Sequence, residues 1–168
     1  MLLRDICRTF NKHEVKFLII GGDAAVYYGA EYVSLDYDLW IRGDEDNFKK
    51  TVKALVELGY CDNSRFIHGN RYYQRWEAFT LGVMVRFQKK GEKPLDIVLR
   101  IQRKTFDSCF RRVNVETTPE GVAMPWVSEK DLVFMKKQAG REKDLLALRQ
   151  IAEKRTAAPG SAPRTRPH

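Results

Sequence analysis

Apolar residues along this chain follow two different spacings, which predicts a fold that combines helices with strands. Leu3, Ile6 and Phe10 lie at helical spacing and predict a first helix over residues 2–11. The apolar run at 15–20 ends at a pair of glycines and is typical of a buried strand. The chain is therefore expected to open as a helix followed by an interior strand.

The rest of the chain alternates between the same two patterns. Asp44 is a cap-type residue and Gly59 a stop signal, so together they bound a helix over about 45–58. Further helices are predicted at 23–29, at 104–112, from Ser128 up to Gly140, and at 142–153. Strands are predicted at 36–41, 72–79, 83–88, 95–101, 113–117 and 122–127, the last two as edge strands. The expected fold class is α/β (α+β), a mixed β-sheet flanked by helices.

Two aspartates on the second predicted strand are the strongest candidates for chemistry. Asp36 and Asp38 are two residues apart, so in a strand their side chains project from one face with Cα atoms roughly 6.6 Å apart. Mg²⁺ sites typically combine one or two carboxylates with substrate phosphates. Gly21 and Gly22 precede the pair and open a short helix, where backbone N–H groups are available to phosphates. The pattern predicts chemistry on a triphosphate.

A third carboxylate comes from a later strand. Alternation in the sequence LDIVLRI places Asp96 on one face of its strand, and that face continues the surface of Asp36 and Asp38 if the two strands are neighbours. Three carboxylates suit two metal ions about 3.5–4 Å apart, an arrangement that clamps the attacking and leaving oxygens of a phosphoryl transfer.

Structural interpretations of the same residues remain open. An isolated Asp-x-Asp pair is more often a solvent-facing strand end, and two glycines often form an ordinary turn. An EF-hand is excluded, because Trp40 stands where the third calcium ligand belongs and Ile41 where the glycine belongs. The segment RYYQRW at 71–76 fits either stacking on single-stranded RNA or an exposed strand.

Composition limits the kind of protein. The 168 residues, 43% hydrophobic and 31% charged, fit one globular domain, expected over 1–153. No apolar run approaches the ~20 residues that cross a bilayer, and the N-terminus lacks a signal-peptide pattern, so a cytoplasmic protein without a membrane partner is expected. The net charge of +8 favours polyanionic partners, nucleotides or RNA among them. Residues 154–168 are basic and proline-rich and are expected to form a disordered tail.

The cysteines give no metal or disulfide pattern. Cys7, Cys61 and Cys109 are odd in number and far apart, without a CxxC spacing. Disulfides and structural zinc are therefore not expected.

Four segments in order resemble the minimal nucleotidyltransferases of the DNA polymerase beta superfamily. They read IIGGDAAVYYGAEYVSLDYDLWI, PLDIVLRI, TFDSCFRR and DLVFMKKQAGREKDLLAL. Within that superfamily the chain is most similar to the bacterial AbiEii-type group, whose members include toxins of toxin–antitoxin systems. The likeness covers residues 15–151, nearly the whole chain apart from its ends.

The resemblance implies a polymerase-beta-like fold and an activity. A nucleoside monophosphate would pass from a nucleoside triphosphate, such as ATP, to an acceptor hydroxyl, with release of pyrophosphate. By the same likeness Asp36, Asp38 and Asp96 are the catalytic residues and the Mg²⁺ ligands, with two ions during turnover, and Asp96 takes the proton. The nucleotide would be bound by Gly21, Gly22, Ser34, Lys136, Lys137, Arg141 and Lys143. The implied acceptors are transfer RNA or another RNA, a protein, or a small molecule, and an antitoxin protein is an implied partner.

The chain also departs from its apparent relatives. They commonly carry an arginine in a stretch RxTxDxD, where this chain has Tyr32 and Ser34. Asp23 is expected at a helix N-terminus, as a cap facing the phosphates that it would repel. These departures support an alternative function, a catalytically weakened nucleotide- or RNA-binding or regulatory module of the same fold.

Overall fold

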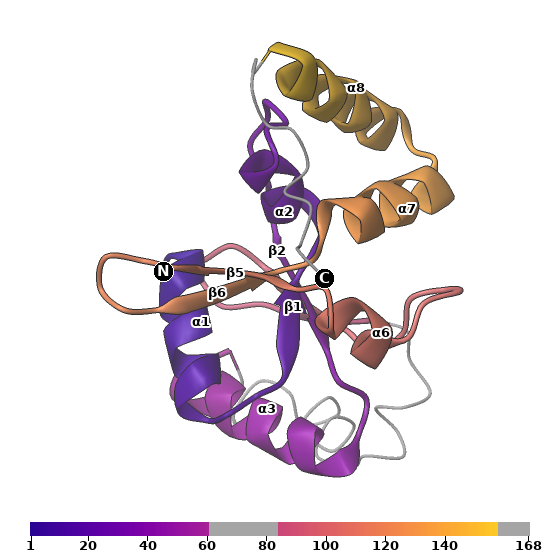
Figure 1. Cartoon of the computed structure of the whole chain (residues 1–168). Coiled ribbons are helices and arrows are strands. Elements are labelled where there is room, and N and C mark those ends of the chain that lie inside the picture. The colour runs from indigo at the N-terminus through magenta and orange to yellow at the C-terminus, as the bar shows by residue number, and fades with distance from the viewer. Residues whose placement is uncertain (61–83, 158–168) are drawn as a thin grey trace.

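The computed structural model describes residues 1–60 and 84–157, which form a mixed sheet with helices around it (Figure 1). The strands are β1 (Phe17–Ile19), β2 (Tyr37–Ile41), β3 (Met84–Phe87), β4 (Leu95–Val98), β5 (Asn114–Thr117) and β6 (Ala123–Trp126). The helices are α1 (Leu3–Lys12), α2 (Gly21–Tyr27), α3 (Glu45–Glu57), α6 (Phe106–Phe110), α7 (Glu129–Ala139) and α8 (Glu142–Ala157). The predicted class, a mixed sheet flanked by helices, is confirmed.

The sheet has the strand order β3-β4-β2-β1-β6-β5. The two central strands, β1 and β2, are antiparallel, and each has a parallel neighbour on its other side, β6 and β4 respectively. The hairpin partners β3 and β5 close the two edges. Since β1, β2 and β4 are buried along most of their length, their sequences are nearly continuous runs of apolar residues interrupted by the aspartates.

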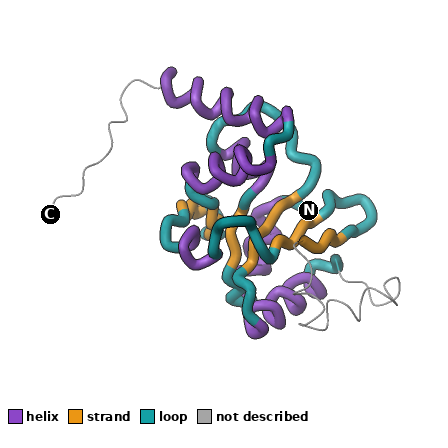
Figure 2. The backbone as a smooth tube through the Cα atoms, turned by 90° about the vertical axis from the view of Figure 1, so that its right-hand side faces the viewer, coloured by secondary structure: helices purple, strands orange, loops and turns teal. Residues whose placement is uncertain are grey.

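Apart from α6, the described helices form two groups at opposite ends of the central strands. Figure 1 shows α1 and α3 together at one end and α7 and α8 together at the other, with α2 on the side of α7. Figure 2, turned by 90°, shows the strands in the middle of the molecule with helices above and below them. Among the described residues, no helix is long and apolar enough to cross a membrane.

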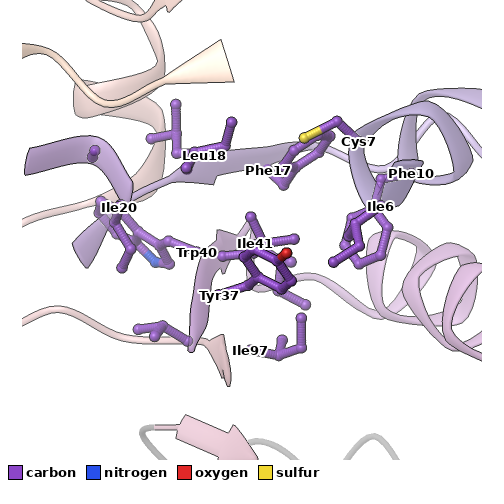
Figure 3. Close-up of a cluster of buried hydrophobic side chains, with 14 of the residues drawn as sticks. Ile6, Cys7, Phe10, Phe17, Leu18, Ile20, Tyr37, Trp40, Ile41 and Ile97 are labelled. Carbon is purple, nitrogen blue, oxygen red and sulfur yellow. The ribbon is translucent and has the colours of Figure 1, made fainter. Parts of the chain in front are cut away.

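A buried cluster ties α1 to the central strands (Figure 3). Phe10 of α1 meets Phe17 of β1 edge-to-face, with ring centroids 5.2 Å apart. Trp40 of β2 is buried, and its Nε1 donates to the carbonyl oxygen of Leu99, just beyond β4, at 3.3 Å. This hydrogen bond fixes β2 against β4, the two strands that carry the aspartates.

The structure confirms several predicted helix ends. The Asp44 side chain accepts a hydrogen bond from the Asn47 N–H at the start of α3, as expected of a cap. Ser128 caps α7 through the N–H of Asp131. Gly140 ends α7 with a left-handed φ of 63°, a conformation that glycine adopts without strain.

Other expectations were wrong in detail. The strand predicted at 122–127 is not an edge strand, because β6 lies between β1 and β5. Its register pairs Ile19 with Trp126, and the N–H of Val127 donates to Ile19, so the contact with β1 lies just past Pro125, which has no N–H to offer. The strand predicted at 95–101 stops at Val98, and an isolated bridge between Ile101 and Lys104 follows it.

The predicted end of the last helix at 153 and the predicted start of α2 at Asp23 also need correction. α8 continues to Ala157, so residues 154–157 are helical, because lysine, arginine and alanine favour a helix and the next proline comes only at 159. α2 begins at Gly21 with Ile20 as its N-cap, which makes Asp23 the third helical residue and not a cap. Cys7 and Cys109 are free thiols. The predictions for 72–79, 71–76, Cys61 and 158–168 lie outside the described residues.

Candidate active site

The strand register brings the predicted carboxylates together. β2 and β4 are parallel neighbours, and Asp38 is the register partner of Asp96. Neighbouring strands are about 4.8 Å apart and register partners share a face, so these two side chains lie side by side. Asp36 lies two residues before Asp38, immediately before the first residue of β2. Its side chain is 31% exposed, whereas that of Asp96 is 3% exposed. The expected neighbourhood of the two strands is confirmed.

Arg86 occupies the centre of this carboxylate group. It lies on β3 directly opposite Asp96, and its Nε and Nη2 each donate to one oxygen of that carboxylate at 2.7 Å. Nη2 also donates to Oδ2 of Asp36 at 2.6 Å. Hydrogen bonds and charge from Asp96, and then from Asp36, raise the pKa of Arg86 still further above its ordinary value. A single guanidinium therefore contacts two of the three carboxylates and offsets one of their two negative charges.

Of these three carboxylates, Asp38 makes no salt bridge with another described residue. Burial raises the pKa of Asp38 to about 6, and the negative charge of Asp36 adds to the effect. The N–H of Gly22 donates weakly to Oδ2 of Asp38, at 3.4 Å, and acts in the opposite direction. Because this group is held near other negative charges, it favours an additional cation in the site.

Gly21 and Gly22 lie in close contact with side chains of the site, Gly21 with Asp38 and Gly22 with Ser34. Gly21 has a φ of +65°, and a Cβ on it would lie 1.9 Å from Oδ2 of Asp38. A Cβ on Gly22 would lie 2.5 Å from the hydroxyl oxygen of Ser34. Both positions thus need glycine, one for conformation and space and the other for space alone. The turn places backbone rather than side chains next to the carboxylates.

Ser34 supports the loop that leads into β2. It is buried, and its hydroxyl donates to the carbonyl oxygen of Asp36 at 2.7 Å. That hydrogen bond holds the backbone of Asp36. Ser34 thus stabilises the loop that carries Asp36, a candidate metal ligand. Its side chain also lines the cleft that contains the three carboxylates.

An open cleft of about 480 Å³ contains these residues. Its charged side chains among the described residues are four acidic and four basic, namely Asp36, Asp38, Asp96, Asp144, Arg86, Lys136, Arg141 and Lys143. The formal charges cancel, so the cleft as it stands offers no excess positive charge to a triphosphate. Divalent cations bound at the carboxylates would supply that excess.

Two of the predicted phosphate-binding residues are tied to an aspartate that the sequence analysis missed. Asp144 of α8 is 1% exposed and accepts from Nζ of Lys136 at 2.9 Å and from Nε of Arg141 at 2.6 Å. Burial alone raises the pKa of Asp144, but hydrogen bonds from Arg141 and Lys136 outweigh it and leave the pKa lowered. Nζ of Lys136 also lies 3.4 Å from the hydroxyl of Tyr32. The spacing of Arg141 and Asp144, three residues apart where α8 begins, was the available signal in the sequence.

The other two predicted lysines have different surroundings. Lys143 is exposed, lines the cleft and makes no salt bridge with another described residue. Lys137 is exposed on another side of α7, where it lines a separate pocket with Glu129 and Arg155. The structure therefore brings Lys136, Arg141 and Lys143 to the carboxylates and leaves Lys137 away from them.

Asp23 has its own counter-ion. Nζ of Lys93 lies 3.9 Å from Oδ1 of Asp23 and 4.3 Å from the centroid of the Tyr37 ring, while Oδ2 of Asp23 is buried and has no hydrogen-bond partner among the described residues. Burial raises the pKa of Asp23, and Lys93 opposes the shift. Lys93 thus offsets part of the repulsion that the sequence predicted between Asp23 and a bound phosphate.

The donor set fits a divalent cation, with one condition. Among residues 1–60 and 84–157, no three His, Cys, Asp or Glu side chains form a ready metal-binding group. The guanidinium of Arg86 instead forms salt bridges with both Asp36 and Asp96. The ligands are nevertheless hard carboxylate oxygens in an open cleft, which suits Mg²⁺. The side chain of Arg86 is 45% exposed, so part of it faces solvent rather than the carboxylates.

Comparisons with known proteins add no further identification. Neither the protein-family models nor the curated proteins that were searched contain a match to this chain. The functional assignment therefore depends on the geometry of the cleft and on the sequence resemblance.

Proposed function

We propose that this protein is an Mg²⁺-dependent nucleotidyltransferase with a polymerase-beta-like fold. The observation that supports it best is the register of Asp38 with Asp96 on adjacent parallel strands, beside the Gly21–Gly22 turn. Three carboxylates from two strands, next to backbone that leaves space for phosphates, suit phosphoryl chemistry better than a structural role.

In the proposed reaction the oxygen of an acceptor hydroxyl forms a bond to the α-phosphorus of a nucleoside triphosphate. The bond between the α-phosphorus and the bridging oxygen to the β-phosphate breaks, and pyrophosphate leaves with that electron pair. Bound Mg²⁺ would neutralise the phosphates and lower the pKa of the attacking hydroxyl. Asp36 and Asp38 would hold the ions, and Asp96 would hold one ion and accept the hydroxyl proton.

The basic residues have different roles in this scheme. Lys143 is positioned to approach the phosphates directly, since it lines the cleft and makes no salt bridge with a described residue. Arg141 is exposed and leaves its bond to Asp144 at the cost of that salt bridge. Lys136 is buried against Asp144 and primarily fixes the position of α8. Arg86 now pairs with Asp36 and Asp96, and if Mg²⁺ occupied these carboxylates its guanidinium would be free to pair with the phosphates.

Labelled nucleoside triphosphates test the proposal. The protein is incubated with Mg²⁺, each of four α-labelled triphosphates, and mixtures of RNA, protein and small hydroxyl compounds. The proposal predicts an acceptor that is labelled by wild type and not by Asp38→Ala, with Asp107→Ala as a control because Asp107 is an exposed acid on α6 away from the cleft. Equal labelling of every acceptor by wild type and Asp38→Ala contradicts it.

The salt bridges of Arg86 favour a second candidate, a binding module that has lost catalysis. If the guanidinium stays on Asp36 and Asp96, it replaces the metal ions and the site cannot turn over. This candidate predicts nucleotide or RNA binding that depends on salt and survives the removal of Mg²⁺. The first candidate predicts binding of a triphosphate only together with Mg²⁺.

A toxin role is a further proposal, which comes from the sequence resemblance alone. It predicts that expression in bacteria without a cognate antitoxin slows growth, and that Asp36→Ala with Asp38→Ala relieves the effect. Equal growth of cells that express either protein, at equal protein levels, removes the toxin role and leaves the chemistry untouched.

A further inference from the structure

A second pocket adjoins the cleft and has a different chemical character. Its volume is about 220 Å³, and its walls include the apolar side chains of Ile101, Leu132 and Met135. It shares five lining residues with the cleft, namely Gly21, Asp38, Lys136, Arg141 and Asp144. The two cavities therefore meet at Asp38 and at the start of α2, where the phosphates are proposed to lie.

Two neutral amides complete the pocket. Gln102 follows the strand β4, and Gln138 is in the last turn of α7; both are exposed at the pocket. A glutamine side chain has a hydrogen-bond acceptor and two donors, which matches the mixed donor and acceptor edge of a nucleobase. Apolar walls with a few polar groups are typical of sites for flat organic ligands.

The positions of the carboxylates indicate which substrate enters the cleft and which enters the pocket. The two substrates are the acceptor and the nucleoside triphosphate. Asp96, the proposed proton acceptor, lines the cleft, as do Asp36 and Arg86, and none of these three lines the pocket. The acceptor hydroxyl must reach Asp96 and therefore enters through the cleft. The nucleoside must extend in another direction from the α-phosphate, and the pocket is the adjoining space that contacts Asp38.

We propose that this pocket receives the nucleobase of the triphosphate, a proposal that rests on the function proposed above. Ile101, Leu132 and Met135 contact the faces and edge of the base, and Gln102 and Gln138 hydrogen-bond its polar edge. The base thereby adds affinity that inorganic tripolyphosphate does not have. Burial of about 60 Å² of the base corresponds to about a tenfold gain in affinity.

Two variants and a control test the pocket through measured binding affinities, without an activity assay. Ala139→Phe fills it from the exposed end of α7, and Gln138→Ala removes one amide without a change in the apolar walls. Lys137→Ala is the matched control, since Lys137 is on the same helix but lines a different pocket. Affinities for ATP, GTP, CTP, UTP and inorganic tripolyphosphate are measured by calorimetry with Mg²⁺, after circular dichroism confirms that each variant is folded.

The expected result is that at least one nucleotide binds wild type and Lys137→Ala about tenfold more tightly than tripolyphosphate. Ala139→Phe reduces that nucleotide to the affinity of tripolyphosphate, and Gln138→Ala changes the order of preference among the four bases. Two results overturn the base pocket while the proposed function stands: equal binding of nucleotides and tripolyphosphate by wild type, or a nucleotide preference that both variants leave unchanged. If wild type binds none of the five probes with Mg²⁺, the proposed function itself fails, and this inference with it.

Discussion

Arg86 and Asp96 are register partners on β3 and β4, and the guanidinium of one holds both carboxylate oxygens of the other, each at 2.7 Å. Planar two-point contacts of this kind are the strongest form of arginine–carboxylate pairing. The same guanidinium reaches Asp36, so a cation of the protein itself stands where a metal ion would bind.

Removal of that guanidinium should therefore strengthen metal binding. In Arg86→Gln, Mg²⁺ no longer competes with a salt bridge, and its affinity is expected to rise up to about fivefold, a modest gain because the arginine is partly exposed. Without Mg²⁺ the variant should be less stable than wild type, since the aspartates then repel one another. Mg²⁺ titration followed by calorimetry measures the first effect and urea unfolding the second. Arg4→Gln, which loses only a surface pair with Glu120, is the control; equal or weaker Mg²⁺ affinity in Arg86→Gln contradicts the competition.

Asp38 gives the metal-free protein a distinctive pH dependence. Its pKa in the folded protein is about 6, above the ordinary value of 3.8, so between these values the folded state holds a proton that the unfolded state has lost. The contribution of Asp38 to stability therefore falls as pH rises from about 4 to about 6, and it stays low above that. Asp38→Asn should remove this loss and stabilise the metal-free protein at pH 7 by about 1–2 kcal/mol, allowing for partial exposure.

Urea unfolding between pH 4 and pH 8 measures that difference. The quantity of interest is the stability of Asp38→Asn minus that of wild type, which should increase with pH over the stated window. Asp107→Asn, a change of the same kind at an exposed site on α6, is measured alongside as the control. A flat curve for Asp38→Asn shows that Asp38 titrates normally.

A comparison of alanine substitutions at Gly21 and Gly121 distinguishes the cost of backbone strain from displacement of Asp38. Both have positive φ, +65° and +77°, but a Cβ on Gly121 meets nothing within 4 Å, whereas one on Gly21 meets Asp38. Each change to alanine is expected to cost about 1 kcal/mol for the backbone conformation. Only Gly21→Ala should also displace Asp38 and abolish binding of Mg²⁺ with a triphosphate. Thermal unfolding and calorimetry check the pair, and full ligand binding by Gly21→Ala refutes the close approach.

Lys136 and Asp144 form a buried ion pair, and removal of the aspartate should destabilise the protein more than removal of the lysine. Asp144→Ala leaves the Lys136 ammonium buried without a carboxylate and should cost about 3–5 kcal/mol. Lys136→Met should cost less, about 1–2 kcal/mol, because Arg141 still pairs with Asp144. The double variant should be more stable than Asp144→Ala alone. Chemical unfolding of the three proteins measures this, and additive losses exclude the coupling.

Much of the fold follows from local signals, because caps, glycine conformations and apolar spacing act over a few residues. Asp44, Ser128 and Gly140 do in the structure what their types predict. The order of strands depends on contacts between distant segments, and for that reason the sequence predicted β6 as an edge strand, whereas it pairs with β1 just beyond Pro125.

The candidate site divides in the same way. Asp36, Asp38 and Asp96 stand out in the sequence as acids within apolar strands, and alternation fixes their faces. Arg86 does not stand out, since an arginine on a short strand is ordinarily exposed, and only the register with β4 brings it to Asp96. The burial of Lys136 likewise depends on the packing of α7 against α8.

Electron paramagnetic resonance of bound Mn²⁺, a stand-in for Mg²⁺, tests the central claim most directly. The protein is titrated with Mn²⁺ in the presence of a non-hydrolysable nucleoside triphosphate, for wild type, Asp38→Asn and the control Asp107→Asn. The account predicts protein-bound Mn²⁺ in wild type and in Asp107→Asn, and its loss in Asp38→Asn. Bound Mn²⁺ that is the same in all three proteins, or absent from wild type, would show that the aspartates of β2 and β4 do not form a metal site.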